Sequence, residues 1–339
     1  MGPGRLWPAR PRLVTHEGAH AAEGRRVERS RREVALLWHV RGAPPCCSLS
    51  FRAPQLLTRT HLLSRLVSRL RYHTLALTEA GDTFSFGFGG SFLNGAGGLG
   101  HGDRTTLETP TKLDSFTAAA VSAGGYHSVA VDASGSVWSW GRGEWGRLGH
   151  NESSDCYEPT LLESVDIGEV ASVLAGDVHT GALTTGGAVY TWGRNENWQL
   201  GYEVTGLLNA GQSLDAQQEP QIVEIPSEAT VTKLSCGELG TAALLSDGTI
   251  YVWGMGRFFE PTKLPGVVES VDGTVVDLQV GAYHLALLTD AGGVYTFGTG
   301  PSLGLPRTAR RQWELAPLEV EGRVVSMSCG PYTTALVVA

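Results

Sequence analysis

The feature that most constrains the fold of this chain is a two-part unit that recurs about every fifty residues. Its first part is a turn of small residues, a histidine and a short apolar strand, as in Gly-Gly-Tyr-His-Ser-Val-Ala-Val at 124–131. Its second part is an alternating aromatic strand that ends in glycine, as in Val-Trp-Ser-Trp-Gly at 137–141. The final glycines of five copies lie 54, 52, 61 and 44 residues apart, and they are Gly87, Gly141, Gly193, Gly254 and Gly298.

The short strands and tight turns of the unit indicate an antiparallel β-meander. Turns such as Ser-Asp-Gly at 246–248 suit hairpins, because glycine adopts a positive φ at low cost. No unit has a helical apolar period, so a helical solenoid is disfavoured. One small sheet cannot bury both of its faces, but several sheets stacked around an axis can. The sequence therefore predicts an all-β fold of radially stacked sheets.

A turn centred on Leu-Gly follows most of the aromatic strands, at 97–101, 146–150, 198–201 and 302–304. With these turns the units resemble the regulator of chromosome condensation repeat family. Residues 121–131 fit that family's second signature at every position. The resemblance covers about residues 72–339. It implies a β-propeller of four-stranded blades, usually seven.

The number of blades stays open at this point. The chain has six copies of the first part of the unit, two of them without histidine, but five aromatic strands. Six blades or an incomplete ring are therefore alternatives to the seven that the resemblance implies. N-terminal strands commonly complete the last blade in this family. The candidate here is Val-Ala-Leu-Leu-Trp at 34–38, which lacks the final glycine.

Charge divides the 339-residue chain into two parts within a net charge of -8. Residues 1–71 hold 14 arginines and four acids, a net charge of +10. Residues 72–339 hold 12 basic residues and 30 acids, a net charge of −18, so we expect no direct nucleic-acid binding by this part. We predict a basic tail at 1–54, a basic amphipathic helix at 55–71 and the propeller at 72–339.

The N-terminal part leaves the cellular address open. A basic amphipathic helix is typical of a mitochondrial presequence or a membrane-surface segment, the arginines at 25–32 suit nuclear import, and a tail without an address is the remaining interpretation. Five cysteines, an odd number, fit a reducing compartment. No stretch reaches the roughly 18 apolar residues of a membrane helix. We expect an intracellular protein without a transmembrane segment, and favour mitochondria over cytoplasm and nucleus.

The sequence offers no nucleophile–base pair, metal-ligand cluster or dinucleotide fingerprint, so we predict no catalytic residue, metal or cofactor. The repeat histidines belong to different blades and cannot converge on one ion. We interpret them as hydrogen-bonding residues between strands or neighbouring turns. The structural repeat positions are His73, His127, His179, His284, Gly141, Gly193, Gly254 and Gly298.

Tryptophan and arginine gather in the turns after the aromatic strands, where we expect them at the surface. Arginine beside an aromatic ring is typical of binding hot spots. The candidate partner-binding residues are Asp103, Arg142, Glu144, Trp145, Arg147, Arg194, Asn195 and Trp198. A long loop at 203–219 interrupts the repeat and is a further candidate for specificity.

Three functions follow from these observations. The first is a non-catalytic, monomeric interaction platform that holds a protein partner. The resemblance implies a second, guanine nucleotide exchange on a Ras-like small GTPase, in which acidic and polar loop residues act near the phosphate and Mg²⁺ site. The third is a mitochondrial RNA-processing or assembly factor, which rests on the basic helix.

Overall fold

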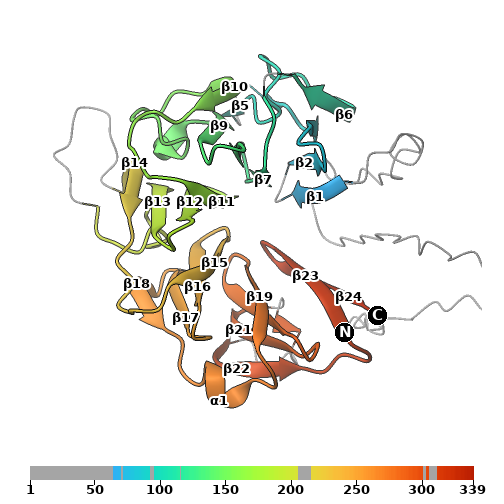
Figure 1. Ribbon diagram of the computed structural model, residues 1–339, viewed down its shortest axis with the longest axis vertical. Coiled ribbons are helices and arrows are strands. Elements are labelled where there is room, and N and C mark those ends of the chain that lie inside the picture. Colours follow the sequence, from blue (N-terminus) through green and yellow to red (C-terminus); the bar gives the residue numbers. More distant parts are fainter. Residues whose placement is uncertain are drawn as a thin grey trace, which may run out of the picture. The chain divides into compact units, whose positions relative to one another are not determined.

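The computed structural model describes residues 64–69, 72–91, 95–114, 116–204, 215–300, 303–304 and 311–339, all within the compact unit of residues 53–339. These residues form five four-stranded antiparallel blades and a sixth sheet of two strands (Figure 1). The prediction of an all-β fold with four-stranded blades is confirmed. The predicted tail at 1–54 and the candidate strand at 34–38 lie outside the described residues.

The four strands of a complete blade pair in chain order, and the first strand of each blade contacts the first strand of the next. Blade 1 contains β1 (Ser64–Arg69), β2 (His73–Thr78), β3 (Thr83–Gly87) and β6 (Leu107–Leu113). Blade 2 contains β7 (Ala120–Ala123), β8 (His127–Val131), β9 (Val137–Gly141) and β10 (Cys156–Leu161). Blade 3 contains β11 (Val170–Ala175), β12 (His179–Thr184), β13 (Val189–Arg194) and β14 (Ala216–Ile222).

The remaining blades follow the same plan. Blade 4 contains β15 (Val231–Cys236), β16 (Gly240–Leu245), β17 (Ile250–Gly254) and β18 (Phe258–Lys263). Blade 5 contains β19 (Val275–Val280), β20 (His284–Thr289), β21 (Val294–Thr299) and β22 (Arg311–Leu318). Blade 6 contains β23 (Val324–Gly330) and β24 (Thr333–Val338). The loops hold β4 (Gly90–Ser91), β5 (Gly95–Ala96), the 3-10 helix η3 (Glu144–Gly146) and the helix α1 (Val267–Ser270).

One strand register recurs and explains two of the repeat positions. The residue that begins the second strand pairs with the glycine that ends the aromatic part of the third, as His179 does with Gly193. Gly193 has a φ of +107°, and a Cβ added there would lie 2.8 Å from the Cα of His179. A larger residue would be strained and would clash. The same pairing joins His73 to Gly87, His127 to Gly141, Gly240 to Gly254 and His284 to Gly298.

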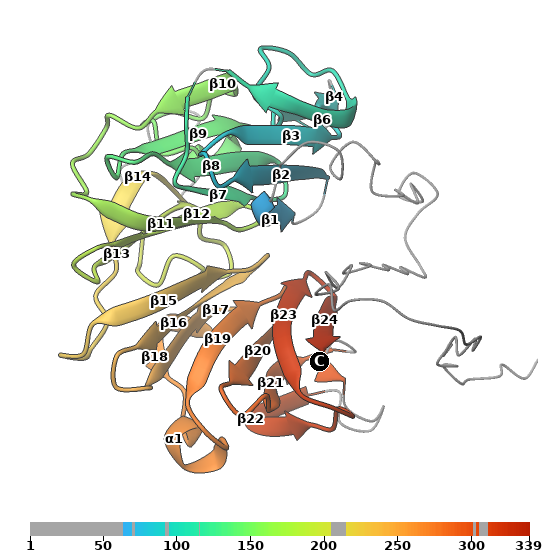
Figure 2. The same cartoon turned by 45° about the vertical axis from the view of Figure 1, so that its right-hand side comes forward.

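The hydrophobic core is divided into five clusters, one between each pair of consecutive blades. Trp192 of blade 3, for example, is fully buried in the cluster that also holds Val129 and Val131 of blade 2. Figure 2 shows the blades lying beside one another in this order. In blades 2 to 5 the aromatic strand is therefore buried by the preceding blade, so a single blade has no core of its own. The equivalent buried side chains are Trp140, Trp253 and Phe297.

The predicted helix at 55–71 is wrong over the residues that the structure describes. Residues 64–69 form β1, which pairs with β2 and places Val67 opposite Ala76. The register shift near its start recurs in the first strands of blades 3 to 6, so β1 is a first strand of the propeller. The backbone of β2 requires hydrogen-bond partners along this edge, and that requirement outweighs the local helical apolar period. The propeller therefore starts before residue 72.

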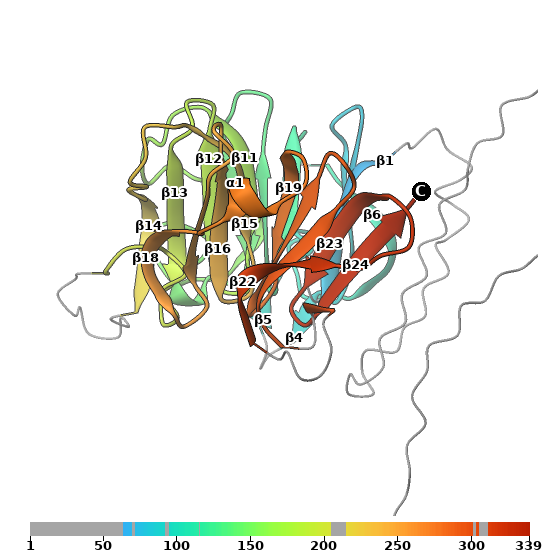
Figure 3. The same cartoon turned by 90° about the horizontal axis from the view of Figure 1, so that it is seen from below.

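Two kinds of connection lie at one end of the strands. Because the strands of a blade alternate in direction, the turn between the first and second strands and the loop between the third and fourth lie on the same side. We name them the inner turns and outer loops, and the side they share the histidine face. In Figure 3 this end of the strands is marked by the short strands β4 and β5, which belong to the outer loop of blade 1. No helix in the described part of the chain is long and apolar enough to cross a membrane.

Candidate functional site

A hydrogen-bond relay ties the inner turns to the outer loops. The Nε2 atom of His127 in blade 2 lies 2.8 Å from the Oγ1 atom of Thr180 in blade 3. Thr180 in turn donates to the carbonyl of Arg147 in the outer loop of blade 2, at 2.7 Å. Since the hydroxyl has one hydrogen and gives it to that carbonyl, the histidine donates from Nε2. Equivalent relays run through His73, Ser128 and Gly98 and through His179, Thr241 and Gln199.

The relay histidines are buried and neutral. Burial lowers the pKa of His73 to about 4 and that of His179 to about 3. Burial also lowers the pKa of His284 to about 4, and the ring of His284 lies 3.0 Å from the hydroxyl of Thr334. The pKa of His127 is lowered well below its usual value by burial and then by the nearby Arg147. Each neutral ring thus forms a hydrogen bond with a hydroxyl of the next blade.

Arg147 is the buried centre of the outer loop of blade 2. Its Nε donates to the carbonyl of Glu144 at 2.8 Å, and an Nη atom donates to the carbonyl of Asp177 in the inner turn of blade 3 at 3.2 Å. Its other Nη atom lies 3.7 Å from the Glu144 carboxylate. Burial lowers its pKa to about 10, so the guanidinium stays charged at neutral pH. Arg147 therefore fixes this loop against blade 3 but offers no surface to a partner.

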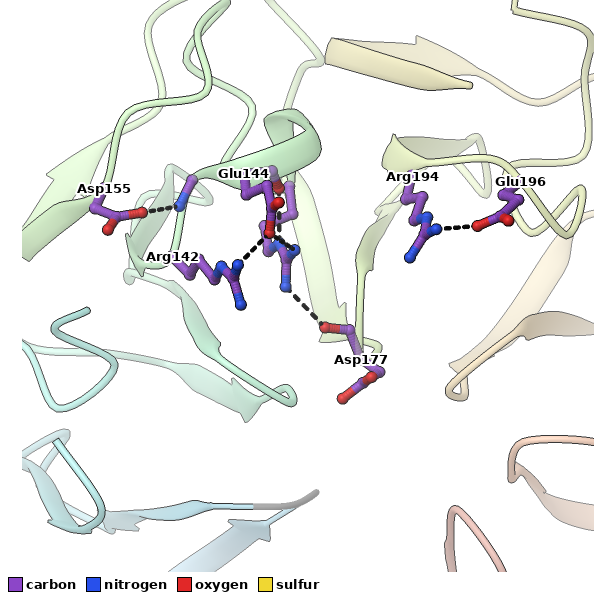
Figure 4. A network of polar contacts seen from close by, with 8 residues as sticks. Arg142, Glu144, Asp155, Asp177, Arg194 and Glu196 are labelled. Carbon is purple, nitrogen blue, oxygen red and sulfur yellow. Dashed lines mark hydrogen bonds and ion pairs between the residues drawn. The ribbon is translucent and has the colours of Figure 1, made fainter. Parts of the chain in front are cut away.

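Partly exposed charged side chains and a tryptophan ring surround this centre. The carboxylate of Glu144, whose side chain is 45% exposed, pairs with Arg142 at 2.5 Å. Arg194 pairs with Glu196, and Figure 4 shows the two pairs facing the same space above Asp177. The Arg194 guanidinium also lies 4.5 Å from the centre of the Trp145 ring, which belongs to the preceding blade. We name Arg142, Glu144, Trp145 and Arg194, which surround the buried Arg147, the arginine cluster.

The structure separates the other three predicted partner-binding residues from this cluster. Asn195 is buried, where its amide donates to the carbonyl of Tyr202 and accepts from the Leu200 N–H, so it shapes its own loop. Asp103 accepts two hydrogen bonds from Thr105 in the outer loop of blade 1. Trp198 packs edge-to-face on Phe259 of blade 4, with ring centres 4.9 Å apart.

Sequence reasoning missed three members of the site's surroundings. The ring centre of Tyr126 lies 5.4 Å from the Arg142 guanidinium, and the backbone carbonyl of Asp177 accepts a hydrogen bond from Arg147. Tyr126 stands one residue before His127, and Asp177 stands two residues before His179. Each lies in an inner turn, on the same face as the outer loops. Glu196 follows Arg194 by two residues in the sequence, and that spacing was a readable signal for the ion pair.

The described residues hold no cluster of three or more His, Cys, Asp and Glu side chains able to bind a metal ion. The four relay histidines each bond to a hydroxyl at a different blade interface. Burial raises the pKa of Cys236 and of Cys329 to about 12, so neither thiol is an activated nucleophile. The arrangement is suited to binding another molecule through fixed side chains.

Comparison with known proteins agrees with this architecture. The model of the regulator of chromosome condensation (RCC1) repeat matches residues 80–131, 134–183 and 186–244, and a second model of that repeat matches 118–146 and 231–259. The human E3 ubiquitin-protein ligase HERC2 is 33% identical over 241 residues, which are 66% of this chain and 5% of HERC2. The mitochondrial RCC1 domain-containing protein RUG3 of Arabidopsis thaliana is 29% identical over 278 residues, which are 77% of this chain and 59% of RUG3.

A solved structure shares the fold. The crystal structure of Prp20p from Saccharomyces cerevisiae superposes with a TM-score of 0.66 at 18% identity, covering 79% of this chain and 66% of that chain. Among the relatives compared above, the chain spans less than two thirds of the length of HERC2 and of RUG3. The repeated sequence unit, the blades it forms and the matches to the repeat models lead to one assignment: this chain is a member of the RCC1 repeat family.

Proposed function

We propose that this chain is a non-catalytic interaction platform and that the arginine cluster is the surface that holds its protein partner. The observation that carries the proposal is the contact between Arg194 of blade 3 and Trp145 of blade 2, beside the paired Arg142 and Glu144. Tryptophan and arginine dominate the hot spots of protein interfaces. Here both lie at the junction of two blades, where the buried Arg147 donates to the carbonyls of Glu144 and Asp177.

The cluster is ordered before any partner arrives. Arg194 lies over an aromatic ring and Trp145 lies in a short 3-10 turn with a φ of +67°. A side chain that is already fixed loses less conformational freedom on binding, which would otherwise cost about 0.5–1.5 kcal/mol per side chain. The exposed carboxylates of Glu144 and Glu196, next to these guanidiniums, add fixed charges of the opposite sign. Such a surface selects a partner by charge pattern as well as by shape.

The test is affinity purification of the full chain from cells, with each recovered protein quantified. Partners held by the arginine cluster are lost from both Trp145→Ala and Arg194→Ala. They are retained by Glu228→Ala, which removes an exposed carboxylate from the opposite face. A partner that binds all four proteins equally would show that this cluster is not the binding surface.

Guanine nucleotide exchange on a small GTPase is the second candidate. It is supported by membership of the family and by the exposed acids Glu144 and Glu196 among the loops of one face. Prp20p, which shares the fold, is described by its binding properties to Gsp1p and histones. Release of a fluorescent nucleotide from a panel of purified small GTPases tests this activity. Absence of acceleration on every member would leave the platform function alone.

A mitochondrial RNA-processing or assembly role is the third candidate. Its support is the net charge of +10 in residues 1–71 and the similarity to RUG3, whose name places it in mitochondria. The chain tagged at its C-terminus should then be imported, and its first residues removed or retained inside the organelle. A diffuse cytosolic signal would refute the role.

A further inference from the structure

Blade 4 departs from the plan of its neighbours on the histidine face. Its outer loop consists of three residues, 255–257, whereas those of blades 2 and 3 have 14 (142–155) and 21 (195–215). In the longer loops a buried leucine and a glycine close over the next blade. A Cβ at Gly149, for example, would lie 2.9 Å from the indole Nε1 of Trp192. The outer loop of blade 4 has no such turn.

Other side chains cover the aromatic strand of blade 5 instead. The ring of Phe297 lies 6.3 Å from that of Phe258 and 5.4 Å from that of Trp313, centre to centre. The relay is replaced as well, since Gly240 stands where blades 1, 2, 3 and 5 have histidine and the buried Met255 fills the space beside it. In blade 4, therefore, aromatic side chains near the surface take the place of the covering Leu-Gly turn.

An arginine and three rings lie at or near the surface here, of which Arg257 and Phe259 are exposed and the rings of Trp198 and Trp313 are half-buried. The Arg257 guanidinium lies 4.3 Å from the centre of the Trp313 ring. Phe259, the residue after Phe258, points to the other side of β18 and is 61% exposed even though it contacts Trp198. We name Trp198, Arg257, Phe259 and Trp313 the blade 4 patch.

Backbone strain marks the same place. Trp198 has a φ of +64°, at a position where blades 1 and 2 have Gly97 and Gly146 with φ values of +68° and +69°. A side chain in this region costs about 1 kcal/mol or more, and such residues gather at binding and catalytic sites. Met255 in the loop of blade 4 has a φ of +59°. One strained residue thus belongs to the patch, and the other lies two residues before Arg257.

The charge of Arg257 indicates what the patch would receive. Arg142 and Arg194 each pair with a carboxylate, whereas no described carboxylate pairs with Arg257. Its guanidinium is exposed and held by a ring, on a propeller that is otherwise rich in acids. A guanidinium in this setting presents its donors to an incoming carboxylate.

We propose that the blade 4 patch binds a segment of a partner protein in which a carboxylate lies beside a large apolar side chain. The carboxylate pairs with Arg257, and the apolar side chain packs on Phe259 and Trp198. The segment docks by side chains and does not add a strand to β18, because Pro261 has no N–H to offer and Glu260 and Lys263 are exposed on that edge. This second surface does not depend on the arginine cluster.

Selection of random peptides displayed on phage against the full chain tests the proposal. We expect a consensus in which Asp or Glu lies next to Leu, Phe or Trp. The synthetic consensus peptide should bind about tenfold more weakly to Arg257→Gln and to Phe259→Ser, and replacing its carboxylate by a carboxamide should have a similar effect on the unmodified chain. On Arg257→Gln the carboxamide peptide should bind no more weakly than the acid.

Two controls keep the outcome specific. Arg104→Gln removes another ring-stacked arginine of the histidine face, in blade 1, and should leave the peptide affinity unchanged. Trp145→Ala should also leave it unchanged, which separates this surface from the arginine cluster. A consensus without an acid, or an affinity that Arg257→Gln and Phe259→Ser do not alter while their melting temperatures match that of the unmodified chain, would overturn the proposal.

Discussion

Acid should unfold this propeller at a pH where its carboxylates are still ionised, because the histidine relays cannot accept protons. In the unfolded chain a histidine takes up a proton near pH 6.5. In the folded chain the pKa is lowered to about 4 for His73 and His284 and to about 3 for His179. The unfolded state therefore binds more protons as the pH falls below about 6.5, and the free energy of unfolding decreases until the folded-state pKa values are reached.

The expected decrease is large. At about pH 5, His73, His179 and His284 each lower the free energy of unfolding by about 2 kcal/mol relative to neutral pH. These three histidines together account for about 6 kcal/mol, compared with about 5–15 kcal/mol for the whole stability of a typical domain, and His127, whose pKa is also lowered, adds to the decrease. Their pKa values lie so low because protonation would place a charge on a buried ring, and the Nδ1 atoms of His127 and His179, which would take up the proton, have no hydrogen-bond acceptor beside them.

Urea unfolding followed by tryptophan fluorescence, repeated from about pH 7.5 to about pH 5, measures the effect. The matched variant is His179→Gln, which keeps a neutral donor but cannot titrate. It should be less stable than the unmodified chain at neutral pH, and its stability should fall less steeply with pH, by about 1.4 kcal/mol per pH unit. Equal slopes for the two proteins, or a stability that does not change over this range, would refute the relay as the source of acid sensitivity.

Three further outcomes follow from particular contacts. Gly193→Ala should cost more than about 2 kcal/mol in urea unfolding, because its φ of +107° and the 2.8 Å approach to His179 leave no room for a Cβ. Thr180→Val should cost about 2–3 kcal/mol by the same assay, because His127 and the Arg147 carbonyl both lose their buried partner. Trp198→Gly should change stability by less than about 1 kcal/mol, since relief of its positive φ offsets the lost ring contact, yet it should weaken the consensus peptide of the blade 4 patch in calorimetric titration. A stability loss for Gly193→Ala or Thr180→Val no larger than that for Trp198→Gly would contradict the assigned contacts.

The repeat made most of the fold predictable. The positions of His127 and Gly141 in the unit fix a strand register, and that register fixes the blade. Residues 64–69 show the limit of such reading, because their apolar residues fit a helical stripe and only the open edge of β2 decides that they form a strand. The open edge of β2 exists only once the blade has formed, so the local sequence pattern of residues 64–69 cannot reveal it.

The candidate site was predictable in part. Trp145 and Arg194 were identified as surface candidates from their loops, but their contact joins two blades and needs the blade spacing to be known. Arg147 and Asn195 carry the same residue types as exposed contacts would, yet both are buried because loop carbonyls and amides recruit them. Arg257 was missed, although the absence of a Leu-Gly turn after residue 254 was visible in the sequence.

In the relays through His73, His127 and His179 a histidine, a hydroxyl and a loop carbonyl occur together, and this explains why blade 4 differs at three places together. A buried hydroxyl needs both a histidine to donate to it and a loop carbonyl to accept from it, and one unmet group costs about 1–3 kcal/mol. When the outer loop shortens to three residues, the carbonyl is lost, so neither a histidine nor a hydroxyl can remain. The sequence accordingly has Gly240 in place of the histidine and the buried Leu285 where Thr241 provides the hydroxyl in the preceding interface. The loss of one loop thus required an apolar interface behind it, and the same loss uncovered Arg257 and Phe259 at the surface.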